Sequence, residues 1–351
     1  LNDIELLLSQ LDKQQLCDFI REECVNDRYF MDRFLALGAG TLYSPDASDY
    51  QQRIKDIISD FEGRDGYVRY NMTFDLNRAI TRIIDEADVA ICNYQWDVAV
   101  SVLEAVATAG EDIIYCGDDS AGQLGDILHY CFQKWHELSS DELLPEGKKS
   151  ELFELSLTHF AEGCLKEFDW WWDWIQMAIQ LADDEEKQGR IIQELDKVIN
   201  IKGDEWGINY NRQVAQRYKL EIMSKRGTPE EQFKFMYENV SNPDFRRRLL
   251  QMAWDRGDYK EVLRLAVDGA THDSDYAGLV NDWHKWELKV YLQTHDHAGS
   301  LRLYQYFFFN GGRFGEEAYS MENIYGQMKS IVLEDEWKDF VETLLNEAAS
   351  S

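Results

Sequence analysis

The chain of 351 residues is poor in proline, and no Pro-, Gly- or Ser-rich stretch is longer than a turn. Linkers between independent domains usually have such compositions. The scarcity of such stretches favours a single continuous helical-repeat domain over residues 1–349. The alternative is a weak domain boundary near residues 145–150, which would divide the chain into 1–146 and 147–349. The four prolines each stand where a helix could begin, and they are Pro45, Pro145, Pro229 and Pro243.

Signals for β-strands are also scarce. The nearest candidate is Asp65-Gly66, a possible turn, followed by Tyr67-Val68-Arg69-Tyr70. A hairpin requires such a turn between two alternating apolar segments, and this stretch has no convincing pair of them. We therefore expect an all-α protein.

Cysteine is sparse, and membrane signals are missing. The six cysteines are too scattered for a disulfide framework and form none of the close pairs that a zinc site needs. No apolar run approaches 18 residues, and no signal peptide opens the chain. We expect a cytoplasmic protein with no membrane contact. Because the sequence starts at Leu1 and not at methionine, we also expect it to be a segment of a longer protein.

Basic residues are outnumbered, with 36 Lys and Arg against 66 Asp and Glu and a net charge of -30. Nucleic-acid binding needs a basic stripe, and the runs Arg246-Arg247-Arg248 and Lys148-Lys149 are short and lie among acids. No direct nucleic-acid contact is expected. The acidity has two interpretations, a solvated helix surface that keeps the chain soluble or an acidic groove for a basic partner.

The chain contains several signals for helix starts. Two patterns predict capping boxes, Asp12 with Gln15 and Thr228-Pro229 with Glu231. Asn242-Pro243 is typical of an N-cap followed by a proline in the first turn. Further helices are expected from Ser48 to Gly63, from about Asp75, and from about Asp27 to Gly38.

A helical hairpin is predicted over residues 245–266. Its first helix would bury Phe245, Leu249, Met252 and Ala253, and after a turn at Gly257-Asp258 its second would bury Tyr259, Val262, Leu263 and Ala266. The pattern of the second helix recurs weakly from Trp96 and from His297, and a helix from Trp337 to Leu345 closes the chain. Since one hairpin cannot bury its apolar face alone, we expect an α-solenoid, a TPR-like right-handed superhelix of antiparallel helical hairpins.

The run FRRRLLQMAWDRGDYKEVLRLA at 245–266, then YAGLV with Trp283 and the closing Trp337, resembles the long helical region of bacterial SWIM zinc-finger family proteins. The opening segment LSQLDKQQLCDFIREECVNDRYFMDRFL resembles the start of that region. A SWIM motif needs C-x-C followed by C-x-H, and the chain contains neither. The resemblance therefore implies a TPR-like helical array with no zinc or DNA site, and any zinc module would precede Leu1.

The run Trp170-Trp171-Trp172-Asp173-Trp174 is the candidate partner-binding site. Consecutive residues on a helix point about 100° apart, so one packing face cannot take all four indoles. Either the helix is buried on several sides, or Trp170, Trp171, Trp172 and Trp174 form an aromatic site for a ligand or peptide. The aromatic run Tyr304 to Phe309 raises the same question, and there sealing the end of the array is favoured.

No residue set predicts catalysis, a metal or a cofactor. Asp118-Asp119 and Asp183 to Glu186 lack the facing carboxylates and basic residues of an aspartate-rich magnesium site, and helix-start acids explain the latter. His295-Asp296-His297 fits a turn. The sequence thus predicts a non-enzymatic scaffold for an unknown protein or peptide, with a basic partner as one option. The alternative is a structural module that positions an amino-terminal SWIM zinc or nucleic-acid-binding domain.

Overall fold

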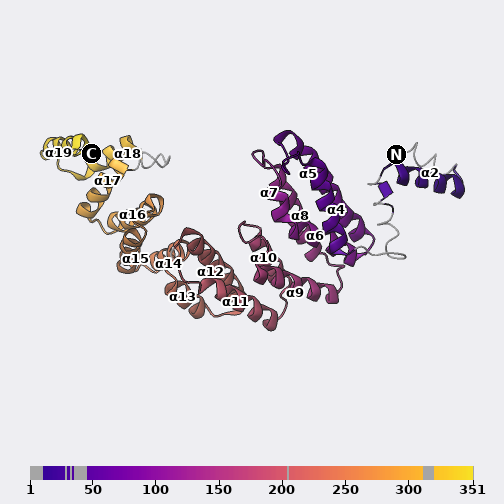
Figure 1. Cartoon of the computed structure of the whole chain (residues 1–351). Coiled ribbons are helices and arrows are strands. Elements are labelled where there is room, and N and C mark those ends of the chain that lie inside the picture. Colours follow the sequence, from indigo (N-terminus) through magenta and orange to yellow (C-terminus); the bar gives the residue numbers. More distant parts are fainter. Residues whose placement is uncertain are drawn as a thin grey trace. The chain divides into compact units, whose positions relative to one another are not determined.

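Every regular element that the computed structural model describes is an α-helix (Figure 1). Extended backbone pairs only at an isolated bridge between Val68 and Gly117 among these residues. The prediction of an all-α protein is confirmed, and the Asp65 to Tyr70 segment contributes no strand beyond this bridge. The structure describes residues 11–27, 30, 31, 34, 46–203, 205–310 and 320–350.

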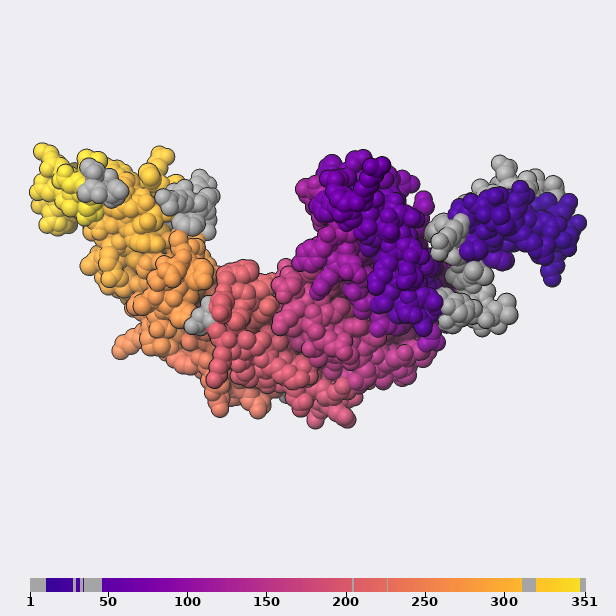
Figure 2. Space-filling model, viewed as in Figure 1, coloured from indigo at the N-terminus to yellow at the C-terminus, as the bar shows by residue number. Residues whose placement is uncertain are grey.

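The chain divides into two compact units, Leu1–Lys197 and Val198–Ser351. Figure 2 follows them by sequence colour, from indigo to rose and from rose to yellow. The boundary falls inside helix α11 (Glu185–Ile199). Residues 145–150, the alternative position for a division in the sequence analysis, lie at the start of a helix of the first unit.

Three helices form the centre of the first unit, because each contacts the other two through apolar faces. They are α5 (Tyr70–Cys92), α6 (Trp96–Thr108) and α8 (Gln123–Ser139). Two more, α9 (Glu146–Glu162) and α10 (Trp171–Leu181), pack on each other, and α10 also contacts α8. The remaining helices of this unit are α2 (Lys13–Asn26), α4 (Ala47–Phe61), α7 (Gly110–Tyr115) and α11, whose last two residues belong to the second unit.

In the second unit, helices that are neighbours along the chain pack on each other from α12 to α18, as helical hairpins require. The predicted hairpin at 245–266 is present, and Gly257 makes its turn at a φ of 72°, a left-handed conformation that glycine adopts without strain. The helices are α12 (Trp206–Arg226), α13 (Pro229–Glu238), α14 (Pro243–Asp255), α15 (Tyr259–His272), α16 (Ala277–Gln293), α17 (His297–Asn310), α18 (Met321–Ile331) and α19 (Trp337–Ser350).

The core of the hairpin differs from the prediction on both of its helices. Met252 is 37% exposed, and Leu265 is fully packed where Leu263 is only partly buried. Leu265, and not Met252, belongs to the buried cluster that packs around Trp283 of α16. At the far end, Leu344 is buried while Leu345 is exposed.

Helix caps were predicted well. The capping boxes at Asp12 and Thr228 are both formed, and the Asn242 side chain accepts a hydrogen bond from the backbone of Asp244. The helix predicted from Asp27 to Gly38 lies largely outside the described residues. Among the residues that are described, no helix combines the length and apolar character needed to cross a bilayer.

Candidate functional site

The predicted tryptophan site lies mainly in the core of the first unit. Trp171, Trp172 and Trp174 are buried because α10 is covered by both α8 and α9. Trp171 stacks on Phe160 at 4.4 Å between ring centroids and donates its indole N–H to the Phe160 carbonyl at 2.9 Å. Trp170 alone is half-buried. The geometry uses three of the four indoles for packing, and a partner-binding role for the cluster stays a prediction.

The exposed tryptophan of the chain is a different one. All eleven tryptophans fall within the described residues, and only Trp206 is exposed, at 71%. It is the first residue of α12 and stacks on Tyr210 one turn later, with centroids 5.5 Å apart and ring planes 9° from parallel. The pair presents a flat aromatic platform to solvent.

This platform lines a groove of about 450 Å³ in the second unit, between α12, the start of α14 and the junction of α15 with α16. We call it the aromatic groove and define it by Trp206, Tyr210, Pro243, His272, Asp273 and Tyr276. Tyr276 is 52% exposed, so the groove has aromatic surface on two sides. Its walls belong to one compact unit.

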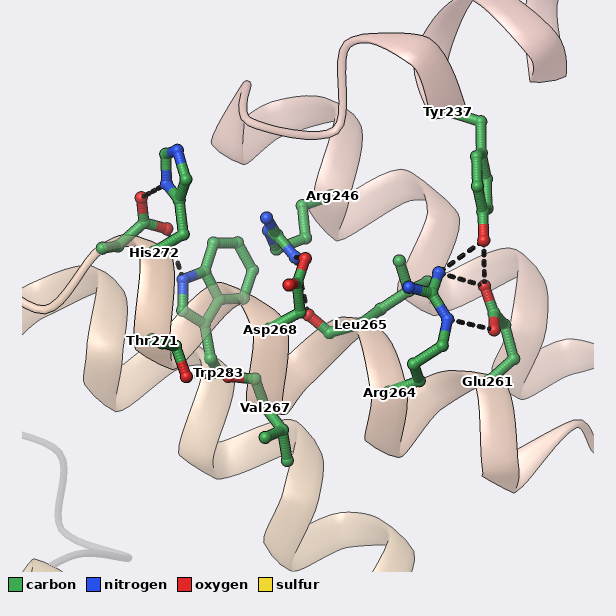
Figure 3. Close-up of polar contacts among 11 residues, drawn as sticks. Tyr237, Arg246, Glu261, Arg264, Leu265, Val267, Asp268, Thr271, His272 and Trp283 are labelled. Carbon is green, nitrogen blue, oxygen red and sulfur yellow. Dashed lines mark hydrogen bonds and ion pairs between the residues drawn. The ribbon is translucent and has the colours of Figure 1, made fainter.

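The wall at the α15–α16 junction is fixed by the buried carboxylate of Asp273. One oxygen accepts from the indole N–H of Trp283 at 2.7 Å, and the other lies 2.7 Å from Nδ1 of His272 (Figure 3). Trp283 is fully buried in the core. The half-exposed His272 is therefore held at the groove by a contact that is anchored in the core.

The opposite wall contains one guanidinium group, and it is turned toward the backbone. Arg212 donates to the carbonyls of Ile199, Ile201 and Gly203 at 3.2, 2.7 and 3.0 Å. These bonds hold the segment that precedes α12. The groove thus combines exposed aromatic faces with a carboxylate and has no arginine or lysine directed at a ligand, which suits a cationic or apolar side chain.

Side-chain hydrogen bonds join the start of α14 to α12 beside the groove. Asn242, buried at the start of α14, donates to the Gln213 carbonyl and to the Gln216 side chain of α12 at 3.2 and 3.0 Å. These bonds join α14 to α12. The groove therefore has packed helices on one side and the turn between α15 and α16 on the other.

A ladder of ion pairs crosses the same three helices. Arg217 of α12 and Arg247 of α14 bind opposite oxygens of Asp244 at 3.3 and 3.0 Å. Arg247 also donates to Asp282 of α16 at 2.8 Å and lies over the Trp283 ring. These residues border a second pocket of about 770 Å³, the arginine pocket, which Arg217, Arg247 and Arg248 line together with the apolar Val214 and Phe245.

Helical spacing places the aromatic groove and the arginine pocket on one face. Trp206, Tyr210, Gln213 and Arg217 follow each other at intervals of four, three and four along α12. Residues at these intervals share one side of a helix. Pro243 of α14, Tyr276 at the N-cap of α16, and Leu279 line the aromatic groove, and Arg247 of α14 pairs with Asp282 of α16. We call this surface the α12–α14–α16 face.

The structure separates the three consecutive arginines that the sequence presents as one basic run. Arg246 is 1% exposed and donates to the Leu265 carbonyl at 2.8 Å and to Asp268 at 3.1 Å (Figure 3). Arg247 belongs to the ladder, and Arg248 is exposed. Consecutive helical positions point in different directions, so one run supplies a core contact, an interhelical contact and a free surface charge.

The acidic and histidine motifs make local caps. The Asp119 carboxylate accepts from the backbone of Leu124 and Gly125 at the start of α8, Asp184 accepts from Lys187, and Asp296 accepts from Gly299. The described part of the chain contains no group of three or more His, Cys, Asp or Glu residues placed to hold a metal. The helix-start and turn interpretations of 183–186 and 295–297 are confirmed by these bonds.

Comparison with protein-family models, curated proteins and solved structures gives no match. The resemblance to the helical region of SWIM zinc-finger proteins therefore stays a prediction. Sequence reasoning missed Trp206, although a signal was present. It stands in the polar stretch KGDEWGINYN, where a tryptophan has few apolar neighbours at helical spacing to pack against.

Proposed function

We propose that the chain is a non-enzymatic scaffold, a TPR-like solenoid of helical hairpins that binds a segment of another protein on the α12–α14–α16 face. The observation that carries the proposal is the exposed Trp206, stacked on Tyr210 at the edge of the aromatic groove. A large indole left in water forgoes the free energy of burial, and such residues are concentrated at the centres of protein interfaces.

The size of the groove fits side chains of a peptide. A volume of about 450 Å³ lies toward the small end of ligand pockets. Both the groove and the arginine pocket are lined by residues of α12 and α14, so an extended chain that follows α12 can reach both. Rigid aromatic walls lose little conformational entropy when a ligand binds.

Charge supports a basic residue at the aromatic groove. The chain carries a net charge of -30, which steers cationic segments toward it and speeds association. At the groove itself, an ammonium or guanidinium group can stack on the Trp206–Tyr210 platform beside Asp273. Raising the salt concentration should therefore weaken binding of basic peptides.

The test is a selection of random dodecapeptides displayed on phage against the purified full chain, followed by fluorescence anisotropy of synthetic binders. Trp206→Ala should weaken binding by roughly 30-fold, because truncating such an anchor costs about 2 kcal/mol. Tyr115→Ala removes an equally exposed aromatic ring from the first unit and is the matched control. Peptides that bind the Trp206→Ala variant and the native chain equally would place the binding surface elsewhere.

A further inference from the structure

The arginine pocket is a local exception to the charge of the chain. Arg217, Arg247 and Arg248 line it, against the carboxylates of Glu221 and Asp244. Glu221 faces Lys225 at 3.7 Å, and Asp244 lies between two guanidinium groups. Arg217 and Arg247 share Asp244, and Arg247 also binds Asp282, so Arg248 leaves the pocket with an excess of positive charge in a chain with a net charge of -30.

Arg248 supplies the unsatisfied charge. It is exposed, and it makes no hydrogen bond, ion pair or ring contact within the part of the chain that the structure describes. Its neighbours in the pocket already hold a carboxylate, since Arg217 and Arg247 bind the two oxygens of Asp244. Guanidinium groups form their strongest hydrogen bonds with oxyanions, so the chemistry of this pocket selects a negatively charged group.

The arginine pocket adjoins the aromatic groove at a defined distance. Trp206 and Arg217 are eleven positions apart on α12, a separation of about 16 Å along a helix axis. An extended peptide covers about 3.3 Å per residue. A bound segment that lies along α12 would therefore span the two sites with about five residues.

We infer that the α12–α14–α16 face recognises an extended peptide segment with two anchors. A cationic or aromatic side chain occupies the aromatic groove, and a side-chain oxyanion, either a carboxylate or a phosphate ester, lies about five residues away on Arg248 and Arg217. This inference rests on the proposed function, because the second anchor is placed by the first. It adds that a purely basic peptide is not the preferred ligand.

The dodecapeptide selection tests the inference through the sequences that it enriches. Peptides whose binding depends on Trp206 should carry an Asp or Glu four to six residues from a Lys, Arg or aromatic residue. Arg248→Glu should lower their affinity at least tenfold, the effect of losing a charge-assisted hydrogen bond and adding repulsion. Arg78→Glu makes the same charge change at an exposed site of the first unit, where the nearest acid lies at 3.7 Å, and should have little effect.

The outcomes separate this inference from the proposed function. If Trp206-dependent peptides are enriched without an acid at that spacing, and Arg248→Glu binds them normally, the two-anchor inference is wrong and the proposed function stands. If no enriched peptide depends on Trp206, both are wrong. Circular dichroism of each variant establishes that the helices are intact, so a loss of binding is not a loss of fold.

The source of the oxyanion is resolved with one enriched peptide and two substitutions at its acidic position. Alanine there should weaken binding about tenfold, and equal affinity would overturn the inference. Phosphoserine carries close to two negative charges and three acceptor oxygens. If it binds more tightly than the acidic peptide, the pocket is assigned to phosphorylated partners, and if it binds more weakly, to carboxylates.

Discussion

Two tryptophans, one in each unit, have opposite environments. In the first, Trp174 is fully buried between Phe132, Trp135 and His159, because α10 contacts both α8 and α9. In the second, Trp206 begins a helix and leaves most of its indole in water. The number of neighbouring helices, and not the residue type, decides whether an aromatic side chain stabilises the fold or is available to a partner.

Ion pairs that join helices also differ in their exposure. Arg53 and Glu86 of the first unit form a two-pronged pair at 3.1 and 2.7 Å, and the Glu86 side chain is 2% exposed. The ladder on the α12–α14–α16 face is half exposed at every step. Exposed pairs contribute little stability and remain accessible, so the ladder can serve recognition at small cost to the fold.

The largest expected effect comes from Trp174→Ala. Truncating a buried indole should lower the free energy of unfolding of the first unit by about 3–5 kcal/mol. Trp206→Ala, by contrast, should change stability by less than about 0.5 kcal/mol while it weakens peptide binding roughly 30-fold. Denaturant unfolding followed by circular dichroism measures both. Equal destabilisation by the two variants would break the distinction between packing and exposed tryptophans.

A smaller effect is expected from Gly269→Ala in the second unit. A Cβ at this position would lie 2.7 Å from Cδ of Arg246 and 3.0 Å from the Trp283 ring. Overpacking of this kind should cost about 1–3 kcal/mol. Gly326→Ala is the control, because nothing lies within 4 Å of its Cβ and it stands inside α18. That variant should gain roughly 0.5–1 kcal/mol from helix propensity.

The same pair of variants tests whether the groove wall at the α15–α16 junction depends on the core of the second unit. If Gly269→Ala shifts Trp283, the Asp273 and His272 contacts that form the groove wall shift with it. Peptide affinity should then fall in parallel with stability, whereas Gly326→Ala should leave affinity unchanged. A destabilised Gly269→Ala variant with native affinity would show that the groove wall does not depend on the core.

Local sequence chemistry predicted the helices and their caps because the interactions involved span only three or four residues. Thr228 with Glu231 and Asn242 with Pro243 are examples. The candidate site could not be predicted in this way. Its residues come from three helices, and whether Trp206 or Trp174 is covered depends on neighbours far away in sequence. The run of three arginines shows the same limit, since adjacent residues have different surroundings.

The smallest effect concerns a cluster on the side of α15, where the Arg264 side chain hydrogen-bonds Glu261 and holds the pKa of that carboxyl below its ordinary value of 4.5 (Figure 3). Tyr237 of α13 also donates to Glu261, at 3.1 Å. Folding lowers the pKa of Glu261, so its contribution to the free energy of unfolding is fully present above a pH of about 4.5. This contribution is lost as the pH falls through the pKa of the folded state. Glu261→Gln should remove this loss, which amounts to less than about 1 kcal/mol for so exposed a pair.

Glu238→Gln is the control, since its nearest cation, Lys234, lies 3.8 Å away. Denaturant unfolding between about pH 5 and 3 should show a flatter pH dependence only for Glu261→Gln. Equal slopes in both variants would mean that this cluster, like the ladder, adds little to the fold and leaves its charges available at the surface.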